Sequence, residues 1–260
     1  MDIGRVALIA HIESDKASLN KQLGTVGAGE QRLYESEAIR CFTSWRRKAG
    51  WLKDIPIYCL CATANRPSAE TVRQLETLGV TYIEEYSPET EKFTSGFITI
   101  PYTGMYFEKV LSEDVLLKID LDNVLLKPFP RDLVEKARMS TVVGRYSEDF
   151  DVCERYCFGG ECPFDTSLII TGRNLGFYKK YYDLCFDEKV LTSPEWLAIK
   201  EVEGEYWLEE YVVDYMYKNR IADITPVQNY QCGYGYPDMA YFIKNRLTGG
   251  LYMTHSHIEL

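Results

Sequence analysis

Strand-like segments alternate with helix-like segments over the first half of the chain, and this alternation restricts the folds that the sequence can adopt. The expected strands are short and mostly apolar, and they are Arg5–Ile12, Ile55–Ala62, Thr81–Tyr86 and Val115–Ile119. Between them, Glu30–Trp51 and Ala69–Leu78 have the pattern of amphipathic helices, and Met105–Leu111 predicts a shorter helix. This order is typical of an α/β fold with a mostly parallel central sheet that is flanked by helices.

The second half of the chain is less regular but continues the alternation. Strands are expected at Ser140–Gly144, Ser167–Thr171 and Gly250–Thr254, and helices near Gly176–Phe186 and Trp207–Lys218. The sequence contains no internal repeat. A chain of 260 residues with ordinary apolar content fits one large domain better than two separate ones.

The charge of the chain argues against several classes of partner. A formal net charge of −10 disfavours a nucleic acid or an anionic membrane, because both bind through clustered Lys and Arg side chains. No apolar run approaches the ~18–20 residues of a membrane span, and the first residues lack the pattern of a signal peptide. We therefore expect a soluble, cytoplasmic protein without a membrane span.

The eight cysteines favour a reducing compartment, because they are too sparse for a disulfide framework. Cys153, Cys157 and Cys162 form the one cluster in the sequence. Its spacing lacks the C-x2-C pair and the nearby His of a zinc site. We expect free thiols there.

Two carboxylates directly follow the strand Val115–Ile119. Asp120 and Asp122 are separated by one residue, so in an extended chain both side chains point the same way and can approach one ion. Carboxylate oxygens suit Mg²⁺ or Mn²⁺, and such a cation can bridge a diphosphate and neutralise the charge on a leaving group. The cation would also let a diphosphate bind to an acidic protein.

The same tripeptide has two other interpretations. Acidic residues after a strand often only solvate a turn. Asp120, Asp122 and Val124 also satisfy the D-x-D-x-[TV] pattern of haloacid-dehalogenase-like phosphatases, in which the first Asp is the phosphorylated nucleophile. That pattern usually lies on the first core strand and needs a later G-D-x-x-x-D pair, whereas here several β/α units precede it and no such pair follows.

Further motifs surround the acidic pair in a consistent order. A helix with Tyr106 and Lys109 precedes the pair, and the apolar stretch Val124–Phe129 follows it. Phe164–Ile170 then opens a later strand that begins with polar residues, among them Asp165, at a position where the family named below usually has Asn. With these motifs the chain resembles the GT-A-fold glycosyltransferases with a D-x-D motif. It is broadly similar to the glycogenin-like and galactosyltransferase-like group and to small soluble enzymes of bacteria and large DNA viruses.

The resemblance implies a Rossmann-like GT-A domain with a nucleotide-binding half, residues 1–122, and an acceptor- and sugar-binding half, residues 123–260. It also implies a nucleotide-sugar donor, with uridine as the favoured base, and a glycan or another hydroxyl compound as the acceptor. The implied cofactor is Mn²⁺ or Mg²⁺.

The resemblance further assigns donor contacts to several segments of the chain. The loop after the first strand would hold the base and ribose, the end of the second strand would lie beside it, and the helix before the acidic pair would face the nucleotide or its phosphates. The assigned residues are Ala10, His11, Ile12, Thr63, Arg66, Tyr106, Lys109, Asp120 and Leu121.

Glu209 and Glu210 match the acidic residue that the family places at the start of a helix. A carboxylate there could take the proton of the acceptor hydroxyl or stabilise the cationic sugar. Asp165 would accept hydrogen bonds from sugar hydroxyls. Acidic residues in a first turn also simply favour the helix dipole, so both interpretations of the glutamates stay open.

The resemblance completes the metal site with a histidine after the last strand. His255, or alternatively His257, would join Asp120 and Asp122, and a neutral imidazole is a suitable ligand for Mn²⁺. The Lys-Pro-Trp element that many retaining members carry after this histidine is absent, which permits an inverting mechanism. The alternative to an enzyme is a catalytically idle domain that only binds a nucleotide or a glycan.

Overall fold

A seven-stranded sheet forms the centre of the protein. The structure is a computed structural model, and it describes residues 4–14, 34–86, 98–145, 164–228, 231–232 and 253–255. The strands of the sheet are β1 (Val6–His11), β2 (Ile57–Cys61), β3 (Val80–Glu84), β4 (Val115–Ile119), β6 (Thr141–Arg145), β7 (Phe164–Gly172) and β8 (Ile224–Gln228). Their order is β3-β2-β1-β4-β7-β6-β8. Strand β7 runs antiparallel to β4 and β6, and the other neighbours are parallel.

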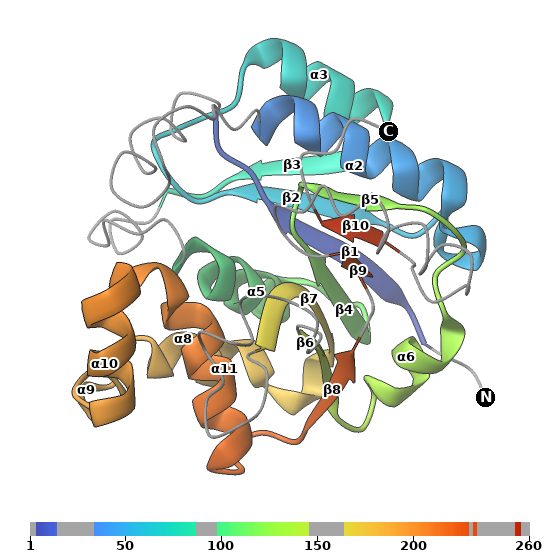
Figure 1. Ribbon diagram of the computed structural model, residues 1–260. Coiled ribbons are helices and arrows are strands. Elements are labelled where there is room, and N and C mark those ends of the chain that lie inside the picture. Colours follow the sequence, from blue (N-terminus) through green and yellow to red (C-terminus); the bar gives the residue numbers. More distant parts are fainter. Residues whose placement is uncertain are drawn as a thin grey trace.

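Helices cover both faces of this sheet (Figure 1). The helices on one face are α2 (Tyr34–Lys48), α3 (Ala69–Thr77) and α6 (Arg131–Lys136). Those on the other face are α5 (Thr99–Val110), α8 (Phe177–Leu184), α9 (Glu188–Leu191), α10 (Pro194–Glu203) and α11 (Leu208–Lys218). Short 3-10 turns lie at Gly50–Leu52, Arg173–Leu175 and Gly204–Trp207. These layers confirm the α/β fold that the alternation predicts.

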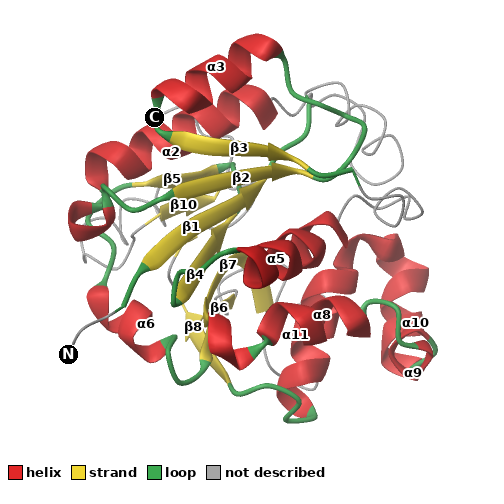
Figure 2. Ribbon diagram, turned by 180° about the vertical axis from the view of Figure 1, so that it is seen from behind, coloured by secondary structure: helices red, strands yellow, loops and turns green. Residues whose placement is uncertain are grey.

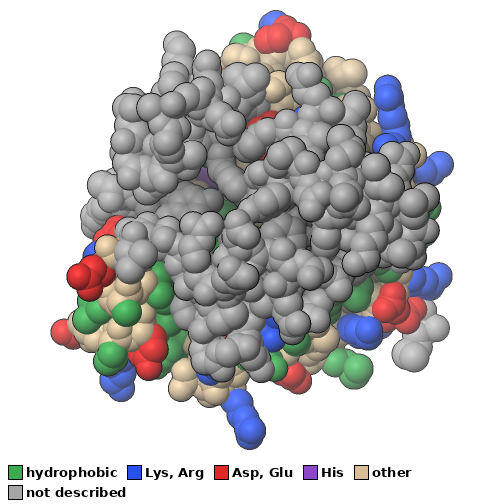
Figure 3. Space-filling view, in the orientation of Figure 1, with side chains coloured by type: hydrophobic (Ala, Val, Ile, Leu, Met, Phe, Trp, Pro, Cys, Tyr) green, Lys and Arg blue, Asp and Glu red, His purple; other side chains and the backbone are tan. Residues whose placement is uncertain are grey.

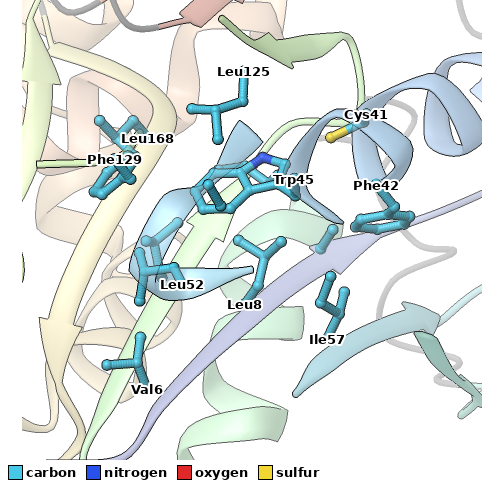
Figure 4. Packing of buried hydrophobic residues seen from close by; sticks show 14 of the residues in the cluster. Val6, Leu8, Cys41, Phe42, Trp45, Leu52, Ile57, Leu125, Phe129 and Leu168 are labelled. Atoms are coloured by element: carbon cyan, nitrogen blue, oxygen red, sulfur yellow. The ribbon is translucent and has the colours of Figure 1, made fainter. Parts of the chain in front are cut away.

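The amphipathic pattern of α2 explains why this helix packs on the sheet. Ala38, Cys41, Phe42 and Trp45 recur at helical spacing and are all buried. The ring of Trp45 lies 5.3 Å from that of Phe129, measured between ring centroids. Figure 4 shows the same helix face packed against residues of β1 and β5. The apolar face of α2 therefore packs into the core on this side of the sheet.

Strand β4 sends alternate side chains into the two cores. Val115, Leu117 and Ile119 belong to the core beneath α2, and Leu116 belongs to the core beneath α5 and α8. All residues of β4 are buried, as expected for a strand with helices on both sides. Lys118 lies on the same side of the strand as Leu116, although it is a charged residue.

A second, smaller sheet lies beside α2. It consists of β5 (Asn123–Leu125), β10 (Met253–His255) and β9 (Gln231–Cys232), in the order β5-β10-β9. The Leu125 backbone N–H donates to Ser44 Oγ at 2.9 Å, which fixes β5 against α2. This sheet brings the described C-terminal residues next to the segment that follows β4.

Several elements differ in their limits from the sequence expectation. Helix α5 begins at Thr99 rather than Met105, because Pro101 lies in its first turn, where a missing N–H leaves no helical hydrogen bond unmade. Strand β7 begins at Phe164 rather than Ser167. Helix α2 ends at Lys48, ahead of Gly50, which has a φ of 65°.

Candidate functional site

The carboxyl ends of the parallel strands meet at one edge of the sheet, and most of the predicted site residues gather there. Figure 2 shows β1, β2 and β3 pointing to the same side. The chain order reverses between β1 and β4, which are neighbours in the sheet. In open α/β sheets, ligands bind at such a switch point. Glu13 follows β1 and Asp120 follows β4, so these two residues flank the switch point.

Asp120 and Asp122 lie on a turn rather than on a strand. The backbone N–H and the side-chain Nδ2 of Asn123 both donate to the Asp120 carbonyl oxygen, at 3.2 and 3.1 Å. The two carboxylates follow β4 as expected, but the segment that connects β4 with β5 is a turn and not the extended chain from which their common direction was inferred. Both carboxylates nevertheless belong to one turn at the switch point. Asp122 is 6% exposed, whereas the side chain of Asp120 is 29% exposed.

Lys118 lies beneath this turn, and it has no place among the site residues predicted from the sequence. Its side chain is 2% exposed, and its Nζ donates to Asp120 Oδ1 at 2.5 Å and to the Thr166 carbonyl oxygen at 2.7 Å. The pairing of β4 with β7 creates this contact. The Asp120 N–H donates to the carbonyl oxygen of Ser167 at 3.1 Å, and this places the neighbouring Thr166 within reach of Lys118. A lysine inside an otherwise apolar strand was the sequence signal for it.

The amino end of β7 supplies buried polar residues to the same edge. Asp165 is 3% exposed, and its Oδ1 accepts the Ser167 N–H at 3.0 Å. Thr166 Oγ1 donates to Glu210 Oε1 at 3.2 Å. The pairing of β6 with β7 shifts register between Val143 and Gly144, so the start of β7 departs from regular sheet geometry. The structure thus brings Asp165 and Glu210 to the side of Asp120.

Glu209 and Glu210 begin α11 and are both buried. Burial raises the pKa of Glu210 to about 8, and the negative charges of Asp165 and Asp120 act in the same direction, while hydrogen bonds from its own backbone and from Thr166 act against it. Burial and the charge of Glu210 raise the pKa of Glu209 well above its usual range. Oε2 of each glutamate has no hydrogen-bond partner among the described residues. Unsatisfied buried carboxylate oxygens of this kind are suited to a ligand hydroxyl or to water.

The loops after β1 and β2 are joined at the same edge. Thr63 Oγ1 donates to Glu13 Oε1 at 2.6 Å, and both side chains are buried. The Ser14 N–H donates to the Asn65 carbonyl oxygen at 2.9 Å. Glu13 and Ser14 were not predicted from the sequence, although they directly follow the predicted first strand.

A pocket of ≈ 340 Å³ lies beside these loops. Its lining residues come from the ends of β2 and β3 and are Cys61, Thr63, Ala64, Arg66, Glu84 and Tyr86. Arg66 forms an ion pair with Glu84, with 3.1 Å between Nε and Oε2. Two of the predicted nucleotide contacts, Thr63 and Arg66, therefore line one pocket.

Several predicted nucleotide contacts have side chains that do not reach this edge. The side chains of Ala10, Ile12 and Leu121 are buried in the core beneath α2, so only their backbone atoms can contact a ligand. Lys109 is exposed at the end of α5 that leads toward the start of β4, which is the opposite edge of the sheet. The spacing of apolar residues could not predict the position of Lys109, because the direction in which α5 runs across the sheet is decided by tertiary packing.

Two other predicted contacts lie closer to the expected place. His11 ends β1 and is half-buried. Tyr106 is half-buried on α5, and its pKa is raised by burial and then by the charge of Glu85, which follows β3.

The structure describes the backbone of one of the two candidate histidine ligands. His255 lies in β10, and its Cα is paired with that of Asn123, the residue after Asp122. His257 lies outside the described residues, as do Cys153, Cys157 and Cys162. Within the described ranges, no group of three or more His, Cys, Asp or Glu side chains is arranged to hold a metal ion. Four other cysteines, Cys41, Cys59, Cys61 and Cys185, are buried free thiols.

No protein-family model and no curated protein sequence matches this chain. Solved structures do match: the glycosyltransferase GlyE of Streptococcus pneumoniae TIGR4 superposes with a TM-score of 0.50, and its apo form with a TM-score of 0.51. The sequence identity is 14% in both cases, and the match covers 98% of this chain and 55% of GlyE. The chain therefore spans about half the length of these proteins and has the fold of a GT-A-like glycosyltransferase domain. In the part of the chain that the structure describes, no helix is long and apolar enough to cross a membrane.

Proposed function

We propose that this chain is a metal-dependent glycosyltransferase. It would transfer a sugar from a nucleoside-diphosphate sugar, with UDP as the favoured nucleotide, to a hydroxyl group of a glycan or of another acceptor. The observation that carries this proposal is the pairing of β4 with β7, which brings the turn of Asp120 and Asp122 next to the buried carboxylate of Glu210. The fold shared with GlyE supports the same class of reaction.

Asp120, Asp122 and His255 are the residues that would hold the cation. Carboxylate oxygens and one imidazole form a donor set that suits Mn²⁺ or Mg²⁺, and the pairing of β10 with β5 lies directly beside the turn. Asp165, Glu209 and Glu210 add further buried carboxyl groups nearby. When bound, the cation would bridge the diphosphate and stabilise the charge on the leaving group.

The remaining roles follow from the order of the strands along the edge. The pocket with Thr63 and Arg66 would receive the nucleotide, with Glu13 near it. Donor phosphates would then lie at the switch point between β1 and β4. The sugar and the acceptor would lie over the start of β7, where Asp165 can accept hydrogen bonds from hydroxyls.

Glu210 is the residue best suited to take the proton of the acceptor hydroxyl. Thr166 holds one of its oxygens at 3.2 Å, and the other has no partner among the described residues. A pKa near 8 lies close to the pH at which a general base is effective. Glu209 is the alternative base, since its Oε2 also has no partner within the described part of the chain.

The test is incubation of the protein with a panel of nucleotide sugars and Mn²⁺, with slow donor hydrolysis as the measured quantity. An Asp122→Asn variant prepared in the same way controls for contaminating enzymes. Hydrolysis of one donor by the wild type alone supports the proposal. Tight donor binding without turnover would instead indicate a binding domain. Stable phosphorylation of Asp120, or release of phosphate from a monophosphate ester, would indicate a phosphatase.

A further inference from the structure

Lys118 is a charged residue in a buried strand, and the proposed transfer does not by itself require it. Its side chain is 2% exposed, and its neighbours in the strand, Leu117 and Ile119, are fully buried. An ammonium group at such a depth is unfavourable unless charged and polar partners offset its lost hydration. Its contacts therefore indicate what this residue does.

The ammonium group of Lys118 links the two sides of the candidate site. One hydrogen bond, 2.5 Å long, runs to Asp120 Oδ1, and another, 2.7 Å long, runs to the carbonyl oxygen of Thr166. The hydroxyl of Thr166 in turn donates to Glu210. Lys118 and Thr166 thus connect the candidate metal ligand with the candidate base, Lys118 through its hydrogen bonds to Asp120 and to the Thr166 carbonyl oxygen, and Thr166 through its hydroxyl group.

This arrangement affects any cation that binds to Asp120. The ammonium group contacts Oδ1, so a metal ion that binds this carboxylate shares it with a positive charge. Two cations on one carboxylate repel each other strongly where water is largely excluded. The diphosphate of a donor brings negative charge to the same place and offsets this repulsion.

We propose that Lys118 is a positioning residue that makes binding of the divalent cation depend on the donor diphosphate. It holds the Asp120 carboxylate in place and weakens metal binding to the donor-free protein. The metal ion and the diphosphate therefore bind together. This inference rests on the proposed function, because it assumes that Asp120 is a metal ligand.

The experiment measures Mn²⁺ binding with and without UDP, by titration calorimetry and by the electron paramagnetic resonance signal of free Mn²⁺. At about pH 7.5, where an unperturbed imidazole is neutral, the wild type should bind Mn²⁺ at least about tenfold more tightly when UDP is present. Lys118→Gln keeps a hydrogen-bond donor but removes the charge. It should bind Mn²⁺ alone at least about tenfold more tightly than the wild type, and UDP should then add little.

Two variants serve as controls. Lys118→Arg keeps the positive charge and should retain the dependence on UDP. Lys189→Gln removes the same charge from an exposed position on α9 and should leave both Mn²⁺ affinities unchanged.

The outcomes separate this inference from the proposed function. Equal Mn²⁺ affinity in the wild type with and without UDP overturns both the role of Lys118 and the metal bridge, because the coupling between two ligands is reciprocal. An unchanged affinity of Lys118→Gln for Mn²⁺ alone, with the dependence on UDP retained, overturns the role of Lys118 and leaves the metal bridge standing. Absence of UDP binding by the wild type, with or without Mn²⁺, overturns the proposed function instead.

Discussion

Glu210 has surroundings very different from water, and the stability of the metal-free protein should reflect them. Its pKa is raised from 4.5 to about 8, mainly by burial. The folded state therefore keeps a proton that the unfolded state releases above about pH 4.5. The stabilisation is complete below that pH and is lost as the pH rises through about 8. We expect the free energy of unfolding to fall by roughly 4 kcal/mol across this range through this group, since one pKa unit corresponds to about 1.4 kcal/mol.

A Glu210→Gln variant isolates this contribution, because glutamine cannot ionise. Its free energy of unfolding, measured by urea denaturation between about pH 5 and pH 8, should decline less steeply with pH than that of the wild type. The difference between the two curves removes the contributions of other titrating groups. Parallel curves would show that Glu210 ionises normally in the folded protein.

Asp122 should matter for transfer and little for folding. In Asp122→Ala we expect sugar transfer to fall by at least about a hundredfold, because the cation that stabilises the leaving group loses a ligand. The melting temperature of the metal-free protein should stay within about 3 °C, since a carboxylate among other carboxylates adds repulsion when no metal is bound. A large loss of thermal stability with metal-free protein would indicate a structural role for Asp122 instead.

At the scale of elements, the contact between α5 and α8 depends on the absence of a side chain. A Cβ atom on Gly104 of α5 would lie 2.0 Å from Cδ1 of Tyr178, and this tyrosine is fully buried. Alanine normally stabilises a helix relative to glycine. Here we expect Gly104→Ala to destabilise the protein by about 1–3 kcal/mol, because the two helices must separate. Urea denaturation measures this change.

The same contact can be tested with a double-mutant cycle. Tyr178→Leu removes the ring that meets the new methyl group, so Gly104→Ala should be far less harmful in that background than in the wild type. The coupling energy between the two substitutions should exceed about 1 kcal/mol. Additive effects would show that the helices do not approach each other at Gly104.

The pairing of β10 with β5 positions the backbone of His255, the proposed third metal ligand. His255 lies opposite Asn123, directly after the turn of Asp120 and Asp122. We expect His255→Ala to weaken Mn²⁺-dependent donor binding. It should also flatten the pH dependence of this binding between about 5.5 and 7.5, because an imidazole must be neutral to bind a metal.

His257→Ala is the matched control for that prediction, and titration calorimetry at several pH values gives both quantities. The residue that acts as the ligand should show both effects, and the other should show neither. If deletion of residues 254–260 left donor binding and its pH profile unchanged, the role of this segment in metal binding would be disproved.

For the molecule as a whole, the net charge of −10 leads us to expect that donor binding requires the cation. Figure 3 shows acidic and basic side chains interspersed around the rim of one face, so basic side chains do not gather there into one large patch. We expect a chelator to weaken UDP binding at least about tenfold, because the carboxylates would then face the diphosphate directly. Titration calorimetry with and without chelator tests this, and equal affinities would contradict the metal bridge.

Ligand linkage provides an independent measurement of the same requirement. At a concentration of about one hundred times its dissociation constant, UDP with Mn²⁺ should stabilise the protein by about 2.7 kcal/mol and raise its melting temperature by about 5 °C or more. UDP with a chelator should give little shift. A large shift from UDP with chelator would show that the protein itself neutralises the diphosphate.

The sequence by itself determined the layers of the fold and the edge at which the site lies. Side-chain periodicity is a local property, so strands such as Val115–Ile119 and helices such as α2 could be predicted from short windows. Right-handed connections and parallel pairing then bring the carboxyl ends of the strands to one edge. For this reason Asp120 could be selected before its contacts were known, whereas Thr63 and Glu210 were selected from the family resemblance.

Only the tertiary structure decided which of these side chains meet. The contact of Lys118 with Thr166 depends on the pairing of β4 with β7, two strands that are far apart in the sequence. The same pairing decides that Asp120 lies beside Glu210. The direction of α5 decides that Lys109 lies at the opposite edge of the sheet, away from the candidate site. Long-range pairing and packing leave no local pattern in the sequence, since they depend on how complete layers fit together.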